Sequence, residues 1–154
     1  MRFAADRMLG RLARWLRIIG QDVAYGAHLS GATLVQTARH EGRVILTRDT
    51  RLVRRRGLPP HLFVTSDHFR EQLRQVVSAF DLASPIGVLT RCLDCNEELL
   101  ETDRGCVRDR VPPYVWATQE RFMTCRRCHR IFWGATHLER MREELAGLGI
   151  TVSK

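Results

Sequence analysis

Four cysteines stand in two matching pairs, and no other feature of this chain restricts its fold as strongly. The pairs are Cys92-x-x-Cys95 and Cys125-x-x-Cys128. Two such hooks let four thiolates surround one Zn²⁺ as a tetrahedron, with zinc–sulfur bonds of about 2.3 Å. The fifth cysteine, Cys106, has no matching partner, and we expect it to be a core thiol rather than a ligand. The spacing therefore predicts one saturated, structural zinc site.

Two other uses of paired cysteines fit the sequence less well. Disulfides form in oxidising compartments, but Arg2, Asp6 and Arg7 interrupt the apolar run that a secretion signal near the N-terminus would need. A redox-active CxxC motif would not require a second matching pair. No stretch approaches the ~20 apolar residues of a membrane span. We therefore expect a soluble, cytoplasmic protein that does not bind a membrane.

The charge of the chain favours a polyanionic partner such as RNA. The formal net charge is +8, and Lys154 is the only lysine among 25 basic residues. Arginine binds phosphate oxygens in pairs, although a GC-rich genome would also replace lysine by arginine. Residues 1–85 hold 14 arginines against 7 acidic residues, whereas residues 86–154 hold 11 basic and 10 acidic residues. We expect the N-terminal part to attract the nucleic acid.

Short apolar runs alternate with amphipathic stretches in the first 85 residues, which is typical of a parallel α/β sheet. We predict strands at Arg2–Ala5, Asp22–Tyr25, Val44–Thr47 and Leu62–Thr65. We predict helices from Asp6 to Gly20, over Ala32–His40 and over Phe69–Phe80. The chain length allows this core plus a small metal-bound module.

The pattern changes at Ser84-Pro85, which predicts an α/β domain over residues 1–85 and a second domain over residues 86–154. Short β segments surround the two cysteine hooks in residues 86–135, and Pro112-Pro113 lies in the long connection between them. This arrangement is typical of a zinc ribbon. A predicted helix over His137–Gly147 closes the chain.

Aspartates follow the ends of three predicted strands. Asp6 follows the first strand, Asp49 the strand ending at Thr47, and Asp67 the strand ending at Thr65. Because the carboxyl ends of parallel strands share one edge, these carboxylates can form a hard-oxygen site for Mg²⁺ or Mn²⁺. Such ions activate water against a scissile phosphate in many nucleases. Any one of these aspartates is explained equally well as a helix N-cap.

Arginines flank these acids in the sequence. They are Arg7, Arg11 and Arg14 on the first helix, and Arg48, Arg51, Arg54, Arg55 and Arg56 around Asp49. A run of charges is often only a solvated face. Here the arginines lie beside acids that would otherwise repel a phosphate backbone, so phosphate positioning is the better interpretation. No aromatic pair forms a base-stacking platform, and we expect Trp15 to pack inside the protein.

Several motifs together resemble the mut-seven C-terminal RNase domain family over nearly the whole chain. They are Met8–Arg17 after Asp6, Leu46-Thr47-Arg48-Asp49, Arg91-Cys92 with Cys95-Asn96, and Cys125-x-x-Cys128 leading into Trp133-Gly134-x-x-His137. The resemblance implies a PIN-like parallel sheet with flanking helices, followed by a C-terminal zinc ribbon and a closing helix. It also implies metal-dependent RNA cleavage, with Asp6 and Asp49 at the metal-binding positions.

The chain departs from this family at one position. Members usually carry an acid at the start of the helix before the strand of Asp49, and this chain has Gly31 there. Asp67 or Asp22 could compensate, or Asp6 and Asp49 could hold the metal together with a substrate phosphate. Without cleavage, the chain would be an RNA-binding module acting with another protein. A third interpretation is a zinc-ribbon adaptor that binds protein.

Overall fold

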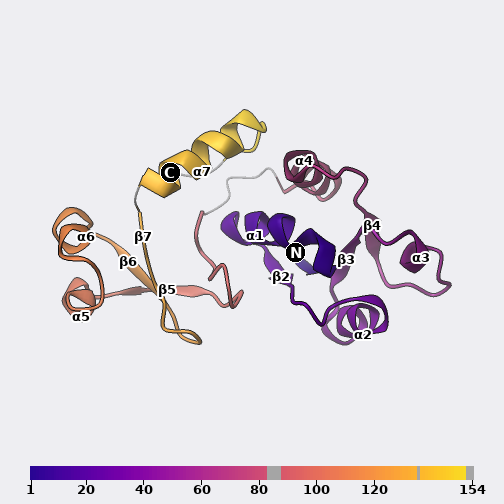
Figure 1. Cartoon of the computed structure of the whole chain (residues 1–154), viewed down its shortest axis with the longest axis horizontal. Coiled ribbons are helices and arrows are strands. Elements are labelled where there is room, and N and C mark those ends of the chain that lie inside the picture. The colour runs from indigo at the N-terminus through magenta and orange to yellow at the C-terminus, as the bar shows by residue number, and fades with distance from the viewer. Residues whose placement is uncertain (83–87, 135, 152–154) are drawn as a thin grey trace.

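A computed structural model of the chain describes residues 1–82, 88–134 and 136–151, without the side chains of Thr136 and His137. It confirms the α/β fold class, with a parallel four-stranded sheet, flanking helices and a separate antiparallel sheet (Figure 1). The predicted break at Ser84-Pro85 lies outside the described residues. No helix within the described ranges is long and apolar enough to cross a membrane.

The larger sheet has the strand order β2-β1-β3-β4, and all its strand pairs are parallel. Its strands are β1 (Arg2–Ala5), β2 (Asp22–Ala24), β3 (Val44–Thr47) and β4 (His61–Phe63). The central strands β1 and β3 are almost wholly buried, as expected for parallel strands that are covered on both faces. Four predicted strands are therefore present, although β2 and β4 end earlier than the apolar runs suggested.

Helices cover both faces of this sheet (Figure 1). The chain leaves β1 through a 3₁₀ turn, η1 (Arg7–Leu9), before α1 (Gly10–Ile18) begins. One core packs α1 and α4 (Phe69–Ala79) against the sheet, and Leu12 and Val76 belong to it. A second core packs α2 (Gly31–Glu41) and α3 (Thr50–Val53) against the opposite face. The sequence did not predict α3, because four residues are too few for a helical repeat.

The end of the chain returns to the first core. The closing helix α7 (Thr136–Gly147) reaches from the smaller sheet back towards α4 (Figure 1). Leu145 and Ile150 are buried in the core of α1 and α4, and Arg70 of α4 donates to Glu144. The division at residue 85 stays a prediction, and the core of the first part includes side chains of the second.

The smaller sheet is antiparallel, with the order β5-β6-β7. Its strands are β5 (Leu99–Thr102), β6 (Phe122–Cys125) and β7 (Ile131–Trp133). Two short helices, α5 (Arg104–Val107) and α6 (Pro113–Thr118), fill the connection where we predicted only β segments. Local capping explains them, because the Asp103 carboxylate accepts from Gly105 N at 2.7 Å and a proline occupies the first turn of α6.

Candidate metal centre and acidic edge

The four paired cysteines converge at one end of the smaller sheet. All four Sγ atoms lie within 4.8 Å of one another, and those of Cys92 and Cys128 are 3.7 Å apart. Four sulfur donors with no other ligand type match the preference of Zn²⁺. Cys106 is not part of this group and is exposed on α5, so the prediction of a core thiol was wrong.

The two hooks are built from the same backbone turn. Asn96 N donates to Cys92 O and His129 N donates to Cys125 O, each at 2.9 Å. The residue after each second cysteine has a positive φ, 65° at Asn96 and 58° at His129. Left-handed backbone is uncommon outside glycine, and asparagine and histidine adopt it more readily than most residues. The turns therefore hold the sulfur atoms together through the backbone.

The thiol groups of this cluster have different pKa values. Burial, together with the neighbouring thiols of Cys128 and Cys92, raises the pKa of Cys95 to about 12. A backbone hydrogen bond from Arg130 lowers the pKa of Cys128 to about 7. A divalent cation bound by thiolates displaces their protons and offsets the repulsion between them. Four thiolates would fill its coordination shell, so the site fits a structural metal and not a catalytic one.

The carboxyl edge of the parallel sheet brings Asp6 and Asp49 into one hydrogen-bond arrangement. The hydroxyl of Thr47 donates to Asp6 Oδ2 at 2.9 Å and accepts from Asp49 N at 3.0 Å. Thr47 is fully buried and Asp6 is 3% exposed. Thr47 was not predicted as a site residue, although it immediately precedes the Arg48-Asp49 pair. Its hydroxyl fixes one carboxylate and the backbone of the other aspartate.

Both aspartates also cap helices, as the alternative interpretation anticipated. Asp6 Oδ1 accepts from Met8 N at 3.5 Å, and Asp49 Oδ1 accepts from Arg51 N at 2.8 Å. Within the described residues, Asp49 Oδ2 has no hydrogen-bond donor. Capping therefore occupies one oxygen of the Asp49 carboxylate and leaves the other available to a ligand.

Asp67 lies beyond the same edge, but its side chain does not join those of Asp6 and Asp49. Its side chain is 83% exposed and pairs with Arg48. Arg48 also donates to Val64 O at 3.2 Å and to Ser66 O, so its guanidinium holds the connection between β4 and α4. Among the described residues, the cysteines are the only set of three or more metal-binding side chains within 4.8 Å of one another. The structure thus does not gather Asp67 with Asp6 and Asp49.

The position of the missing acid is open space. Gly31 begins α2 with φ +51°, and apart from its chain neighbours and the backbone of its own helix, no described residue has an atom within 4 Å of the place where a Cβ would stand. Asp22 cannot replace this acid, because it begins β2 and thus lies at the opposite edge of the sheet. Burial alone would raise the pKa of Asp22, but hydrogen bonds from Arg43 at 2.6 Å and Asn96 at 2.7 Å lower it. The suggestion that Asp22 compensates was therefore wrong.

The candidate phosphate-binding arginines fall on both faces of the sheet. Arg7 and Arg14 are exposed along η1 and α1. Arg11 lies on the same helix, 3.7 Å from the ring centroid of Phe69, and Phe69 also stacks on Trp15. Arg51 and Arg54 are exposed on and just after α3. No described residue forms an ion pair with Arg51 or Arg54.

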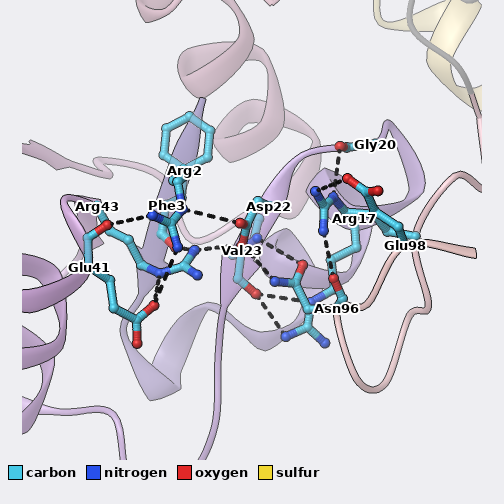
Figure 2. A network of polar contacts seen from close by, with 11 residues as sticks. Arg2, Phe3, Arg17, Gly20, Asp22, Val23, Glu41, Arg43, Asn96 and Glu98 are labelled. Carbon is cyan, nitrogen blue, oxygen red and sulfur yellow. Dashed lines mark hydrogen bonds and ion pairs between the residues drawn. The ribbon is translucent and has the colours of Figure 1, made fainter. Parts of the chain in front are cut away.

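A polar network joins the first cysteine hook to the parallel sheet (Figure 2). Arg17, which is 5% exposed, donates to Val23 O at 2.8 Å and to Leu93 O at 2.7 Å. Asn96 accepts from Val23 N at 2.9 Å and donates to Asp22. The sequence contained one signal for this contact, since Arg17 falls on the apolar side of α1 and a buried arginine requires partners. The metal-binding hook is therefore bonded directly to β2.

The chain was compared with known proteins. The Mut7-C RNAse domain matches residues 1–145, from β1 into α7. No curated protein and no solved structure matches the chain. The family match confirms the resemblance found in the sequence and covers both sheets.

Proposed function

We propose a function from one premise: this chain belongs to the Mut7-C RNAse domain family, whose model matches residues 1–145. In this proposal the protein is a metal-dependent ribonuclease that hydrolyses phosphodiester bonds of RNA. Asp6 and Asp49 hold Mg²⁺ or Mn²⁺, and Asp67 is a weaker third candidate because it pairs with Arg48. The four cysteines hold a structural Zn²⁺. We also propose a cytoplasmic location, since the cysteines bind metal only when reduced.

The observation that carries this proposal is the bridge through Thr47. The hydroxyl donates to Asp6 Oδ2, so this buried carboxylate has a fixed orientation at the carboxyl edge of the sheet. The same hydroxyl accepts from Asp49 N, and Asp49 keeps one oxygen without a donor among the described residues. A divalent cation held by carboxylates would polarise water and neutralise charge on the scissile phosphate. Arg7 and Arg51 are exposed and follow these acids closely in the sequence, and in this proposal they hold the RNA backbone.

Asp6→Asn and Asp49→Asn test the proposed site. Asparagine keeps the shape and one acceptor oxygen but removes the charge that a cation needs. We expect each change to lower the Mn²⁺-dependent cleavage rate of a labelled single-stranded RNA by about 100-fold or more. Asp103→Asn is the matched control, because Asp103 caps α5 in the same way at a place remote from the edge. Equal rates in all three variants would refute the assignment.

Gly31 favours a second candidate function, an RNA-binding module without cleavage. The acid that family members carry is absent, and the structure offers no replacement at that place. Tight RNA binding by the wild type without cleavage would support this function. A protein-binding adaptor would instead show no RNA affinity, whereas phosphate binding would be present and weaken steeply with salt.

Gly31→Asp tests whether the missing acid limits activity. The added side chain enters open space, and aspartate tolerates positive φ better than most residues, so we expect a stability cost of only about 1 kcal/mol. We expect a rise of about tenfold in the cleavage rate at limiting Mn²⁺, because a third carboxylate strengthens cation binding. Gly31→Asn has the same shape without the charge and should not show this rise. If Gly31→Asn raised the cleavage rate as much as Gly31→Asp, the rise would come from the change in backbone conformation and not from the added charge.

A further inference from the structure

An open hollow of about 650 Å³ lies on the face of the sheet that α2 and α3 cover. Its lining includes three apolar residues, Ala32, Val35 and Leu58, and three arginines, Arg39, Arg55 and Arg56. The arginines come from two segments, α2 and the connection between α3 and β4. The hollow thus combines apolar contact surface with guanidinium groups on both sides of it.

The charge of this hollow is unbalanced. None of the described residues that line it is acidic, whereas a hollow of similar volume between β2 and the first cysteine hook is lined by acids, among them Asp22, Glu41 and Asp94. Arg55 and Arg56 are exposed. Neither side chain forms a hydrogen bond or an ion pair with any of the described residues. Their positive charge therefore stays available to a polyanion.

A hydrogen bond between the two segments sets the shape of the hollow. Arg39 Nη2 donates to Gly57 O at 2.6 Å. Gly57 has φ +69°, a left-handed conformation that favours glycine. This turn follows Arg55 and Arg56 directly, so the bond from Arg39 holds them beside α2. Arg39 is a positioning residue in this arrangement.

Both sides of the hollow begin at the acidic edge of the sheet. Leu29 O, just before α2, accepts from Arg7 N at 3.2 Å, next to Asp6. On the other side, Asp49 caps α3, and the chain continues from α3 into Arg55. From Ala32 the lining extends along α2 to His40, a distance of about 12 Å at 1.5 Å per residue. The hollow therefore leads away from the proposed metal site.

We propose that this hollow binds a single-stranded segment of the RNA whose backbone continues from the acidic edge. The identity of the ligand rests on the proposed function. Arg55 and Arg56, which Arg39 holds beside α2, bind successive phosphates, and the apolar lining contacts a ribose or an unpaired base. A duplex would not present an unpaired base, because its bases are paired and stacked inside the helix. Among the described residues, the lining contains no phenylalanine, tyrosine or tryptophan, and His40 is its only ring side chain.

The test uses the zinc-loaded full chain with Asp6→Asn, so that binding is measured without cleavage. The probe is a fluorescent single-stranded RNA of roughly 20 nucleotides, longer than the 4–16 that a small single-strand-binding domain covers. We expect Arg55→Ala with Arg56→Ala to raise Kd about tenfold at 0.15 M salt and to reduce the slope of log K against log salt by about 1.4, or ~0.7 per lost phosphate contact.

Two further double variants separate the local effect from general charge and from misfolding. Arg126→Ala with Arg140→Ala removes the same charge from two exposed sites on the other part of the chain, and should change Kd less than about twofold. Arg55→Lys with Arg56→Lys keeps the charge, and should restore most of the affinity and the salt slope.

Several outcomes would overturn the proposal. They are equal losses of RNA affinity in the two alanine double variants, tighter binding of a hairpin duplex than of the single strand, and tighter binding of a polyglutamate peptide than of RNA. The result is independent of catalysis. If the wild type never cleaves RNA but alanine at Arg55 and Arg56 weakens binding, only the ribonuclease proposal is refuted. If the wild type cleaves RNA and the same alanine pair leaves binding unchanged, only the proposal that the hollow binds RNA is refuted.

Discussion

Cys125→Ser is expected to abolish Zn²⁺ binding at the proposed four-cysteine site and to unfold the antiparallel sheet, which is the largest loss of stability that we predict. Cys125 is fully buried and ends β6, so its sulfur belongs to both the metal site and the sheet. Structural zinc contributes about 10–16 kcal/mol of binding free energy in small domains, and little of this survives the loss of one thiolate. Metal analysis and far-ultraviolet circular dichroism of the full chain measure the two effects.

Cys106→Ser is the matched control for this experiment. It makes the same chemical change at an exposed cysteine outside the metal-binding group. We expect an unchanged metal content of one ion and an unchanged unfolding curve. A folded Cys125→Ser protein without metal, or the same loss in both variants, would show that the four thiolates do not hold the sheet together.

Arg17→Ala is expected to lower the free energy of unfolding by about 4 kcal/mol, because buried carbonyl groups left without a donor cost about 1–3 kcal/mol each. Arg17 donates to Val23 O, Leu93 O and Asp94 O, and the alanine variant leaves all three without this partner. Chemical denaturation of the zinc-loaded chain, followed by circular dichroism, gives the difference.

Arg14→Ala is the control on the same helix. Arg14 is exposed on α1, so we expect a change within about 0.5 kcal/mol. Arg17→Lys keeps the charge but loses the guanidinium fork that reaches two carbonyl groups at once. Its loss in the free energy of unfolding should therefore lie between those of Arg17→Ala and Arg14→Ala. If Arg17→Ala cost no more than Arg14→Ala, the contact between the first hook and β2 would be of no energetic importance.

Local patterns were sufficient to predict most elements of the fold. The apolar runs of β1 and β3 are buried on both faces, and the cysteine spacing alone identified the four thiols that converge. The helix α3 was not predicted, because it is defined by the capping aspartate Asp49 and is too short to show a helical repeat of apolar residues. The turns at Asn96 and His129 each require one residue with a positive φ. The sequence indicates such a residue only through its type, because asparagine and histidine tolerate this conformation better than most residues.

The candidate site was harder to predict, because its side chains are fixed by contacts between distant segments. Asp6 and Asp49 follow strands, so their common edge could be expected, but the hydroxyl of Thr47 that joins them could not. Asp67 was expected beside them, and its pairing with Arg48 depends on the path of the connection after β4. Asp22 was misplaced because its bond to Asn96 spans 74 residues of sequence.

The burial of Leu145 and Ile150 in the first core has a consequence for the order of synthesis. A ribosome adds roughly 5–20 residues per second, so the ~60 residues after Leu82 take about 3–12 s to appear. During that interval the segments that form the parallel sheet, the acidic edge and the basic hollow have been synthesised, but part of their core is missing. We expect ribosome-bound chains stalled before α7 to be cleaved by protease within α1 or α4, and released full-length chains to resist. The part of this protein that holds the parallel sheet would then become fully protected only after its last helix has been made.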